Sequence, residues 1–448
     1  MKKLYFCARA LQDYLSHIKN VDMLNLPAAE SFAPELLDLP FVQKFLSSLS
    51  RAEDDNEISG ATNIAGLRLD FNCGLRLELP EGNFRVVISD FDSGQIFFDR
   101  NISDVRLVSV EKYFIRWRVE IFLDGAKILN HILDLEKQNV HIAFDKGSGL
   151  GDILAFLPFA QEFKRIFKSH VVISLPDYLS ELAANFYPEL EQDAAINFYA
   201  TYYPLINFGD FPTVTADVRS APLNRMAGEI LGLKIIPPKP TFKPTLPKLF
   251  KEPYVCIGVQ ASTPTKGWLY PDGWKIIVDY LKSLGYRVFC VDKNAEETNN
   301  DITIKMPEGA ENFTIGIPLP ECANIFSHAE FCIAVSSGLV SLADAVNCPV
   351  VMIAGFSQDW CEFYTPYRVA NRKVCNGCFN DMRRVPLSKC MFHKDTPREL
   401  ECQKKISPRM VINAIERLIA DKQLIPPARS IKKANLINFS TERRHQSC

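Results

Sequence analysis

The chain has 448 residues, of which 47% are hydrophobic and 23% are charged, a composition that excludes a largely disordered protein and predicts two or three globular domains. Its 51 Lys and Arg residues nearly balance its 53 Asp and Glu residues, so no overall field draws the protein to nucleic acid or to anionic lipid. The sequence has neither the apolar core of a secretory signal nor an apolar run of about 20 residues. We therefore expect a cytoplasmic protein with no membrane span.

Residues 1–138 predict a β-rich N-terminal domain that begins with a mixed helical segment over residues 5–50. Short runs alternate apolar and polar residues, the period of a half-buried antiparallel sheet, and turns that contain glycine separate several of them. The expected strands cover residues 66–71, 74–79, 84–89, 95–98 and 114–122.

Strands and helices alternate from residue 139 onward, which predicts parallel sheets. We expect a first Rossmann-like domain over residues 139–235, in which an initial strand leads into a helix marked by Phe156, Phe159 and Phe163. Further strands of this domain are expected at residues 171–176, 195–199 and 205–208.

A proline-rich linker over residues 236–250 precedes a second Rossmann-like domain over residues 251–425. Five prolines between residues 235 and 249 remove too many amide donors for a helix or a central strand. Strands of the second domain are expected at residues 254–259, 287–292, 331–336 and 349–355, and its helices at residues 273–284, 319–328, 339–347 and 408–424. Ligands of open α/β sheets bind at the carboxyl ends of the strands, so we expect a ligand cleft between the two domains.

The basic tail over residues 426–448 fits either a solvated chain end or a partner-binding arm.

A glycine-rich turn connects the first strand of the first Rossmann-like domain to its helix. It contains Gly147, Gly149 and Gly151, which let the backbone turn tightly and approach a ligand, and it ends at Asp152. An acid at this position does not suit a dinucleotide pyrophosphate. Asp152 can instead take a proton from an incoming hydroxyl as a general base, or it can cap the helix, and the spacing leaves both readings open.

Two further loops at the ends of strands in the second domain suit a diphosphate. Ser262 and Thr263 can donate to phosphate oxygens, and Lys266 can neutralise the charge of a diphosphate leaving group, the alternative being a solvated loop lysine. In the other loop a strand ends and a helix begins, so backbone amides and the helix dipole point at a phosphate. Its candidate binding residues are Ser336, Ser337, Gly338 and Leu339, with Ser336 as a simple N-cap the alternative.

The thirteen cysteines form no regular disulfide pattern, and those inside apolar runs behave as small buried hydrophobes. Cys375, Cys378, Cys390 and Cys402 differ, because a Cys-x-x-Cys pair with two later thiols suits tetrahedral thiolate coordination. The sequence alone favours structural zinc, with four thiolates leaving no open catalytic position, and thiolate-rich sites also suit iron. Replacement of one thiol by His393 and a cluster of free thiols remain the alternatives.

The order of these motifs resembles that of the ADP-heptose-dependent glycosyltransferases of the GT-B fold. The resemblance rests on the Gly-Leu-Gly-Asp run that ends at Asp152, on Ser262 and Lys266, and on the Ser-Ser-Gly-Leu run that begins at Ser336. Lipopolysaccharide heptosyltransferases show the same order. The β-rich N-terminal domain and the late cysteine cluster are similar more narrowly to the bacterial autotransporter heptosyltransferases, over roughly residues 60–420.

The resemblance implies an α/β protein of GT-B architecture with two Rossmann-like domains, a β-rich N-terminal domain and a cysteine metal finger over residues 372–405. It implies an inverting heptosyltransferase in which Asp152 is the catalytic base and Lys266 binds phosphate, with no catalytic metal. The implied donor is ADP-heptose and the implied acceptor is a Ser hydroxyl of an autotransporter adhesin. It also implies structural iron on the four cysteines, with zinc as the alternative, and a homo-oligomer. This chain departs from many lipopolysaccharide enzymes, which have Asp where Ser336 stands and His where Ser341 stands.

Two other functions compete with this hypothesis. A lipopolysaccharide core heptosyltransferase would use a sugar acceptor, but it would not require the N-terminal domain or the cysteine finger. The other candidate is a non-enzymatic protein that binds nucleic acid through the basic cysteine finger, but such a protein would have no function for its two α/β domains. The finger also lacks the interleaved aromatic residues of proteins that bind single strands. We therefore expect no nucleic-acid partner.

Overall fold

The computed structural model divides the chain into two compact units. The first unit comprises Met1–Ser148, Phe156–Ser180 and Tyr187–Pro238, and the second comprises Gly149–Ala155, Glu181–Phe186 and Lys239–Cys448. The structure describes residues 2–6, 52–60, 62–144, 148–194, 196–204, 214, 219–235, 237, 239, 242–299, 302–314, 316–381 and 390–428.

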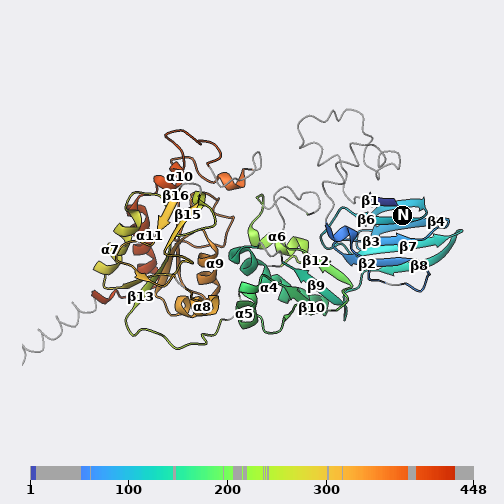
Figure 1. Cartoon of the computed structure of the whole chain (residues 1–448), viewed down its shortest axis with the longest axis horizontal. Helices are drawn as coiled ribbons and strands as arrows, with labels where there is room; N and C mark the ends of the chain where they lie inside the picture. Colours follow the sequence, from blue (N-terminus) through green and yellow to red (C-terminus); the bar gives the residue numbers. More distant parts are fainter. Residues whose placement is uncertain are drawn as a thin grey trace, which may run out of the picture. The chain divides into compact units, whose positions relative to one another are not determined.

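A four-stranded antiparallel sheet forms one layer of the first unit, in the order β5-β4-β7-β8 (Figure 1). Its strands are β4 (Phe84–Asp90), β5 (Ile96–Ile102), β7 (Trp117–Leu123) and β8 (Ala126–Ile132). The buried Trp117 ring contacts Phe97 edge-on at 5.6 Å and Phe6 of the neighbouring sheet at 5.9 Å. Aromatic packing of this kind joins the two sheets around one core.

An eight-stranded mixed sheet forms the other layer of the first unit, in the order β1-β6-β3-β2-β12-β9-β10-β11. Its strands are β1 (Lys2–Phe6), β2 (Arg68–Asn72), β3 (Arg76–Leu79), β6 (Val105–Ser109), β9 (Asn139–Ala143), β10 (His170–Ser174), β11 (Glu191–Gln192) and β12 (Ala200–Tyr202). Strand β2 pairs in parallel with β12 through Phe71 and Ala200. The strands of the β-rich N-terminal region therefore continue the parallel sheet of the region that follows.

Three α-helices accompany the parallel strands of this region: α4 (Leu150–Phe167), α5 (Asp177–Phe186) and α6 (Leu223–Ile230). A short 3-10 helix, η1 (Ala52–Asp55), precedes β2. Buried phenylalanines at positions 156, 159 and 163 mark the inner face of α4, as their helical spacing predicts. Residues 150–155 of α4 and Glu181–Phe186 of α5 group with the second unit.

A six-stranded, fully parallel sheet forms the centre of the second unit, in the order β17-β14-β13-β18-β19-β20. Its strands are β13 (Tyr254–Gly258), β14 (Arg287–Cys290), β17 (Glu311–Asn312), β18 (Phe331–Val335), β19 (Val350–Ile353) and β20 (Arg368–Val369). A separate antiparallel hairpin joins β15 (Glu296–Asn299) to β16 (Ile302–Lys305). Every residue of β13, β18 and β19 is buried, as expected for strands with helices on both faces.

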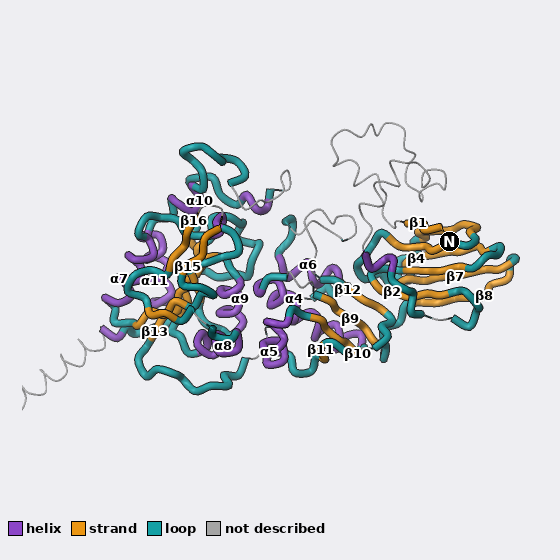
Figure 2. Tube along the Cα trace, in the orientation of Figure 1, coloured by secondary structure: helices purple, strands orange, loops and turns teal. Residues whose placement is uncertain are grey.

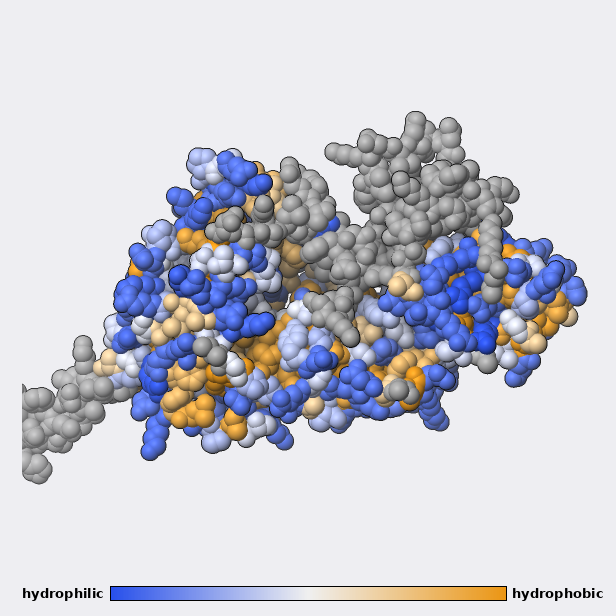
Figure 3. Space-filling view, viewed as in Figure 1, coloured by the Kyte–Doolittle hydropathy of each residue, from blue (hydrophilic) through white to orange (hydrophobic). Residues whose placement is uncertain are grey.

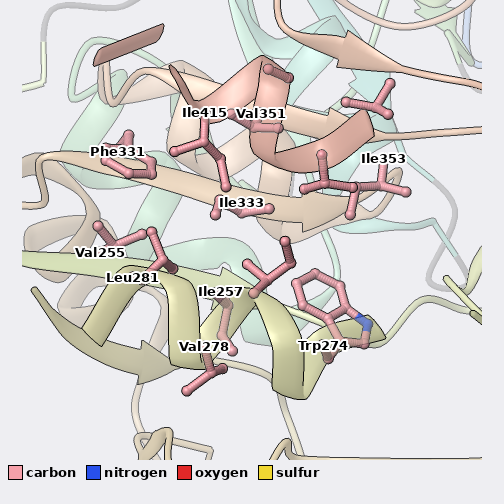
Figure 4. Packing of buried hydrophobic residues seen from close by; sticks show 14 of the residues in the cluster. Val255, Ile257, Trp274, Val278, Leu281, Phe331, Ile333, Val351, Ile353 and Ile415 are labelled. Carbon is pink, nitrogen blue, oxygen red and sulfur yellow. The ribbon is translucent and has the colours of Figure 1, made fainter. Parts of the chain in front are cut away.

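Alternate side chains of the central strands point to one face of this sheet, where helices pack on them. Val255 and Ile257 of β13 pack in one hydrophobic cluster with Trp274, Leu281 and Ile415 (Figure 4). The helices of the second unit are α7 (Gly273–Ser283), α8 (Leu319–Ser327), α9 (Gly338–Ala345), α10 (Glu401–Lys404) and α11 (Pro408–Asp421). Two 3-10 turns, η2 (Pro264–Lys266) and η3 (Cys378–Asn380), lie in loops, and loop predominates around the cysteine segment (Figure 2).

The sequence expectations differ from the structure in several places, and they omit β6, β8, the β15–β16 hairpin, α5, α6 and α10. Tyr5 and Phe6 belong to strand β1, so the helical segment expected over residues 5–50 is wrong at its start, and residues 7–50 lie outside the described residues. The strand expected at 195–199 forms instead at Ala200–Tyr202, where β9 and β2 supply partners. The strand expected at 205–208 and the tail from residue 429 onward also lie outside the described residues.

The surface of the described residues carries hydrophobic side chains in small groups that hydrophilic residues separate, on the face drawn in Figure 3. No helix within the described ranges is both long enough and apolar enough to cross a bilayer.

Candidate active site and cysteine cluster

Asp152 lies in the first turn of α4, three residues after Gly149. Its carboxylate turns back toward the helix start and accepts a hydrogen bond from the Gly149 amide, but Asp152 is the third residue of the helix and not the N-cap residue that the alternative reading expected. Burial raises the pKa of the Asp152 carboxyl, while the positive charge of Lys266 and this amide act to lower it. The group is therefore a half-buried acid within electrostatic reach of a lysine. Residues 145–147 of the same turn, including Gly147, lie outside the described residues.

Two helix starts approach each other closely within the second unit, because both carry glycine at the contact. A Cβ atom on Gly338 would lie 2.7 Å from the Leu150 Cβ and 3.1 Å from the Gly151 amide nitrogen. A Cβ atom on Gly151 would lie 3.0 Å from the Ser341 Oγ. The positive ends of the α4 and α9 dipoles therefore meet beside Asp152, an arrangement that favours an anion.

The loop after β13, residues 262–269, carries the predicted phosphate ligands and is called the lysine loop below. Ser262 is exposed, and the hydroxyl groups of Thr263 and Thr265 form a short hydrogen bond with each other. Lys266 ends the η2 turn and is partly buried. Of the predicted ligands in this loop, Lys266 is the one whose charge reaches Asp152.

Asp292 holds the backbone just before the lysine loop. Its buried carboxylate accepts hydrogen bonds from the amides of Val259, at 2.7 Å, and Gln260, at 3.1 Å. Burial raises the pKa of Asp292 to about 6, against the effect of these two amides. Asp292 follows β14, so the ends of two neighbouring strands are fastened together.

Ser336 is buried at the end of β18, and both of its donors are used within the protein. Its hydroxyl donates to the Glu362 carboxylate and its amide donates to the Ile353 carbonyl at 3.3 Å. Glu362 also accepts from Ser357, at 2.6 Å, and from Arg368, at 2.8 Å. Burial would raise the pKa of Glu362, but the Arg368 charge and these hydrogen bonds hold the pKa below its usual value.

The N-cap position of α9 is Ser337 rather than Ser336, which corrects the alternative reading of Ser336 as a cap. The Ser337 side chain makes no capping hydrogen bond, and its Oγ is buried with no protein partner among the described residues. Gly338 and Leu339 begin the helix, so their amides have no partner inside it. The donors left for a ligand at this loop come from residues 337–339.

The four predicted metal ligands, Cys375, Cys378, Cys390 and Cys402, line one cavity together with His393. Every cysteine among the described residues is a free thiol. The ligand atoms that come within 4.8 Å of one another belong to Cys375, His393 and Glu401. The structure thus brings the four cysteines around one cavity, with a histidine and a carboxylate beside them.

The chemistry of this cavity fits a metal that binds thiolates. Burial, together with the neighbouring thiols of the cluster, raises the pKa of Cys378 and of Cys402 to about 12. Thiolates crowded in this way repel one another, and a bound cation would remove that repulsion and deprotonate the thiols. Glu401 already accepts hydrogen bonds from the Cys375 amide, at 3.1 Å, and from Arg398.

Comparison with known proteins places these features in a family. Residues 64–125 match the N-terminal domain of glycosyltransferase TibC, and residues 234–390 match glycosyltransferase family 9 (heptosyltransferase). The chain is 38% identical over 363 residues to the autotransporter heptosyltransferase BAHTCr of Citrobacter rodentium, a match that covers 78% of this chain and 88% of that protein. It is 36% identical over 361 residues to the autotransporter heptosyltransferase TibC of Escherichia coli, covering 78% and 89% of the two chains. The chain belongs to the autotransporter heptosyltransferase family.

A solved structure of TibC from enterotoxigenic E. coli, described as an iron-containing dodecameric glycosyltransferase, matches this heptosyltransferase with a TM-score of 0.78 at 34% identity. The match covers 82% of this chain and 98% of that one. A second TibC structure, with equal similarity, contains ADP-D-beta-D-heptose. These findings confirm the α/β fold of a GT-B glycosyltransferase with an added N-terminal domain, and they confirm that the chain is a glycosyltransferase.

Several polar residues of this heptosyltransferase site were not predicted from the sequence. Asp292, Glu362 and Arg368 reach the strand ends from distant parts of the chain, and Glu401 stands beside the cysteines. One signal was available for Asp292, because a carboxylate directly after an apolar strand of a parallel sheet falls at the ligand-binding edge. No comparable signal marks Glu362, which lies in a loop.

Proposed function

We propose that this protein transfers heptose from ADP-heptose to Ser hydroxyls of an autotransporter adhesin, with inversion at the anomeric carbon. Family membership supports the donor and the class of acceptor. The observation that carries the proposal is the half-buried Asp152 carboxylate, whose pKa burial raises and which lies within the electrostatic reach of Lys266. A base with a raised pKa and a cation for the leaving group are the two groups that glycosyl transfer to a hydroxyl requires.

The reaction requires one proton transfer and one displacement. The acceptor oxygen attacks the anomeric carbon of heptose and forms a new C–O bond, while the bond from that carbon to the diphosphate oxygen breaks and ADP leaves. Asp152 takes the hydroxyl proton as the new bond forms and later releases it to solvent. Lys266 compensates the charge that develops on the departing diphosphate.

The start of α9 supplies further stabilisation for the diphosphate in this proposal. The amides of Ser337, Gly338 and Leu339 point along the helix dipole, and the buried Ser337 hydroxyl lacks a protein partner. Ser262 and Thr263 are proposed to add donors from the lysine loop. Ser336 supplies no donor to the diphosphate in this proposal, because its hydroxyl is held by Glu362 and its amide by the Ile353 carbonyl.

Bound iron on Cys375, Cys378, Cys390 and Cys402 belongs to the proposal as a structural cross-link, with zinc as the alternative metal. The solved relative is iron-containing and dodecameric, and the four thiols here line one cavity. Such a metal would hold together a segment that is largely loop. We propose a homo-oligomer for this chain as well, and transfer in the cytoplasm before the adhesin is exported, with the N-terminal β-rich region helping to seat the polypeptide.

The transfer assay tests this function directly. The purified protein is incubated with ADP-heptose and either an unmodified autotransporter passenger domain or a truncated core lipid, and the acceptors are weighed by mass spectrometry. The proposal expects heptose-sized mass increases on the passenger domain. Modification of the core lipid alone would instead identify a lipopolysaccharide enzyme.

A variant pair tests the base within the same assay. Asp152→Asn keeps the shape of the side chain but cannot accept the proton, so transfer should fall at least about a hundredfold while ADP binding persists. Asp177→Asn is the matched control, since Asp177 is an exposed carboxylate in the first turn of α5. Transfer by Asp152→Asn at the rate of Asp177→Asn would refute the assignment of the base.

A further inference from the structure

The segment that follows Cys402 is hydrogen-bonded directly to the lysine loop. The Gln403 side-chain Nε2 donates to the Thr265 carbonyl at 2.6 Å, and the Leu269 amide donates to the Gln403 carbonyl at 3.4 Å. The Trp268 ring nitrogen donates to the Ile406 carbonyl at 2.8 Å. Contacts on both sides of Lys266 therefore tie its loop to this short stretch of chain, residues 403–406.

These contacts are shielded from water. Gln403 and Ile406 are fully buried, and Thr265 and Trp268 are 2% and 4% exposed. A hydrogen bond in such surroundings is expensive to lose, because the carbonyl left behind finds no water. The Gln403 Oε1 atom is itself buried without a protein partner among the described residues. An amide placed here thus leaves one acceptor unsatisfied while its donor fixes the position of Thr265.

The other end of this segment belongs to the cysteine cluster. Gln403 directly follows Cys402, and Thr265 lines the same cavity as the four thiols. The Cys402 carbonyl packs so closely on Gly355 that a Cβ atom there would lie 2.3 Å from its oxygen. The Gly355 carbonyl in turn accepts from the amide of Gly377, between the first two cysteines, at 2.9 Å. Cys402 and the buried residues that follow it therefore contact both the cysteine cluster and the lysine loop.

We infer that Gln403 is a positioning residue that couples the cysteine cluster to the nucleotide-binding lysine loop. A metal held by the cluster would fix Cys402, Cys402 would fix Gln403, and Gln403 would fix the turn that ends in Lys266. The inference rests on the proposed function, because the lysine loop matters only if it binds the diphosphate of the donor. In this inference the cysteine cluster has a role within the subunit, in addition to any role in the assembly of an oligomer.

The first experiment measures the affinity for ADP by calorimetry, with the metal content and the subunit number of each protein recorded in parallel. Gln403→Leu removes the donor and keeps most of the side-chain volume. We expect about tenfold weaker ADP binding, the effect of one lost buried hydrogen bond, with the metal retained. Gln403→Glu should weaken binding more, since a carboxylate oxygen would face the Thr265 carbonyl.

A matched control separates positioning from a general loss of stability. Asn324→Leu removes a buried amide of the same unit that holds Thr245 and Leu246, far along the chain from the lysine loop. This variant should bind ADP as the wild type does. Equal ADP affinity in Gln403→Leu and in the wild type would overturn the inference, and so would equal losses in Gln403→Leu and Asn324→Leu.

A double-variant cycle tests the coupling itself. Cys402→Ser should weaken ADP binding in the wild-type background and weaken it much less when Gln403→Leu is already present. The same fold loss in both backgrounds would refute the coupling through Gln403. Failure of the wild type to bind ADP at all would count against the proposed function instead, so the two failures are distinguishable.

Discussion

Substitution of Gly338 by Ala tests whether close contact between the two helix starts matters for transfer. The new Cβ atom would lie 2.7 Å from the Leu150 Cβ, whereas ordinary contact begins at 3.4 Å. The starts of α4 and α9 must therefore move apart by about 0.7 Å, which is the difference between these two distances. Gly338 has no positive φ, so alanine itself introduces no backbone strain.

The expected magnitude follows from two opposing effects on stability and one on geometry. Overpacking costs about 1–3 kcal/mol, and alanine gains up to about 1 kcal/mol over glycine in a helix, so the variant should remain folded. A displacement approaching 1 Å between catalytic and binding groups costs on the order of tenfold to a hundredfold in rate. We expect transfer to fall by that factor because Asp152 moves away from the start of α9, which we propose binds the donor.

The assay is the transfer rate at saturating acceptor, with thermal unfolding measured for each variant. Gly151→Ala serves as the graded comparison, because its Cβ atom would meet the Ser341 Oγ at 3.0 Å, and a serine side chain can rotate away. Its rate should lie between those of the wild type and Gly338→Ala. A Gly338→Ala protein that transfers heptose within twofold of the wild-type rate would refute the reasoning.

Four further predictions concern pH, stability and metal binding. Lys266→Met removes the charge that lowers the pKa of Asp152, so the acid limb of the kcat/KM profile should move to higher pH; an unmoved limb would contradict this. Burial holds the pKa of Asp152 in the folded protein above its value in the unfolded chain, so the free energy of unfolding falls as the pH rises from the unfolded to the folded pKa. Asp152→Asn should therefore melt at a higher temperature than the wild type at pH 8 but not at pH 3. Arg76→Met leaves the buried Asp70 carboxylate without its bidentate partner and should cost about 3–5 kcal/mol in urea unfolding, much of which adding Asp70→Leu should restore. Cys378→Ser should abolish the binding of stoichiometric metal, as measured by elemental analysis. Substitution by serine of a cysteine in a strand of the sheet, such as Cys332, should leave the metal content unchanged.

The elements that the sequence predicted well are those whose signals are local. The four helices expected in the second unit begin and end within three residues of the expected positions, and Pro408 stands at the start of α11 as its fixed φ favours. Strands β13, β18 and β19 could be predicted from the sequence, because a strand that is buried on both faces requires a continuous apolar run. Periodicity and composition decide such elements without knowledge of their neighbours.

Two of the strands that were missed have no strong pattern of their own and form on partner strands. Strand β8 exposes or half-exposes every residue, so no alternation marks it, and it forms because β7 offers hydrogen bonds. Strand β12 has three residues and lies between β2 and β9. The junction of the N-terminal strands with the parallel sheet arises at this strand, and no local pattern could have indicated it.

The candidate site divides in the same way. Asp152 stands in the first turn of α4 and Lys266 in the loop after β13, and both follow strands of a parallel sheet, so topology alone predicted them at the edge where such sheets bind ligands. Glu362 and Gln403 could not be predicted, because their partners Ser336 and Thr265 lie 26 and 138 residues away along the chain. Buried polar residues that hold a loop look like ordinary surface residues until the fold supplies their partners.

Three polar side chains, of which Asp292 and Gln403 are buried and Glu362 is partly buried, hold the strand-end loops of the second unit in the same way. Asp292 fastens the amides after β13, Glu362 fastens Ser336 after β18, and Gln403 fastens Thr265. Asp292, Glu362 and Gln403 come from different parts of the chain. Each loop is therefore fixed by a hydrogen bond to a segment other than the strand that it follows. An apolar residue at any of the three positions would avoid the cost of burying a charge or an amide. Loops that are already fixed around the diphosphate lose less conformational entropy when the donor binds. This gain in donor affinity explains why polar residues stand here although apolar residues would make the protein more stable.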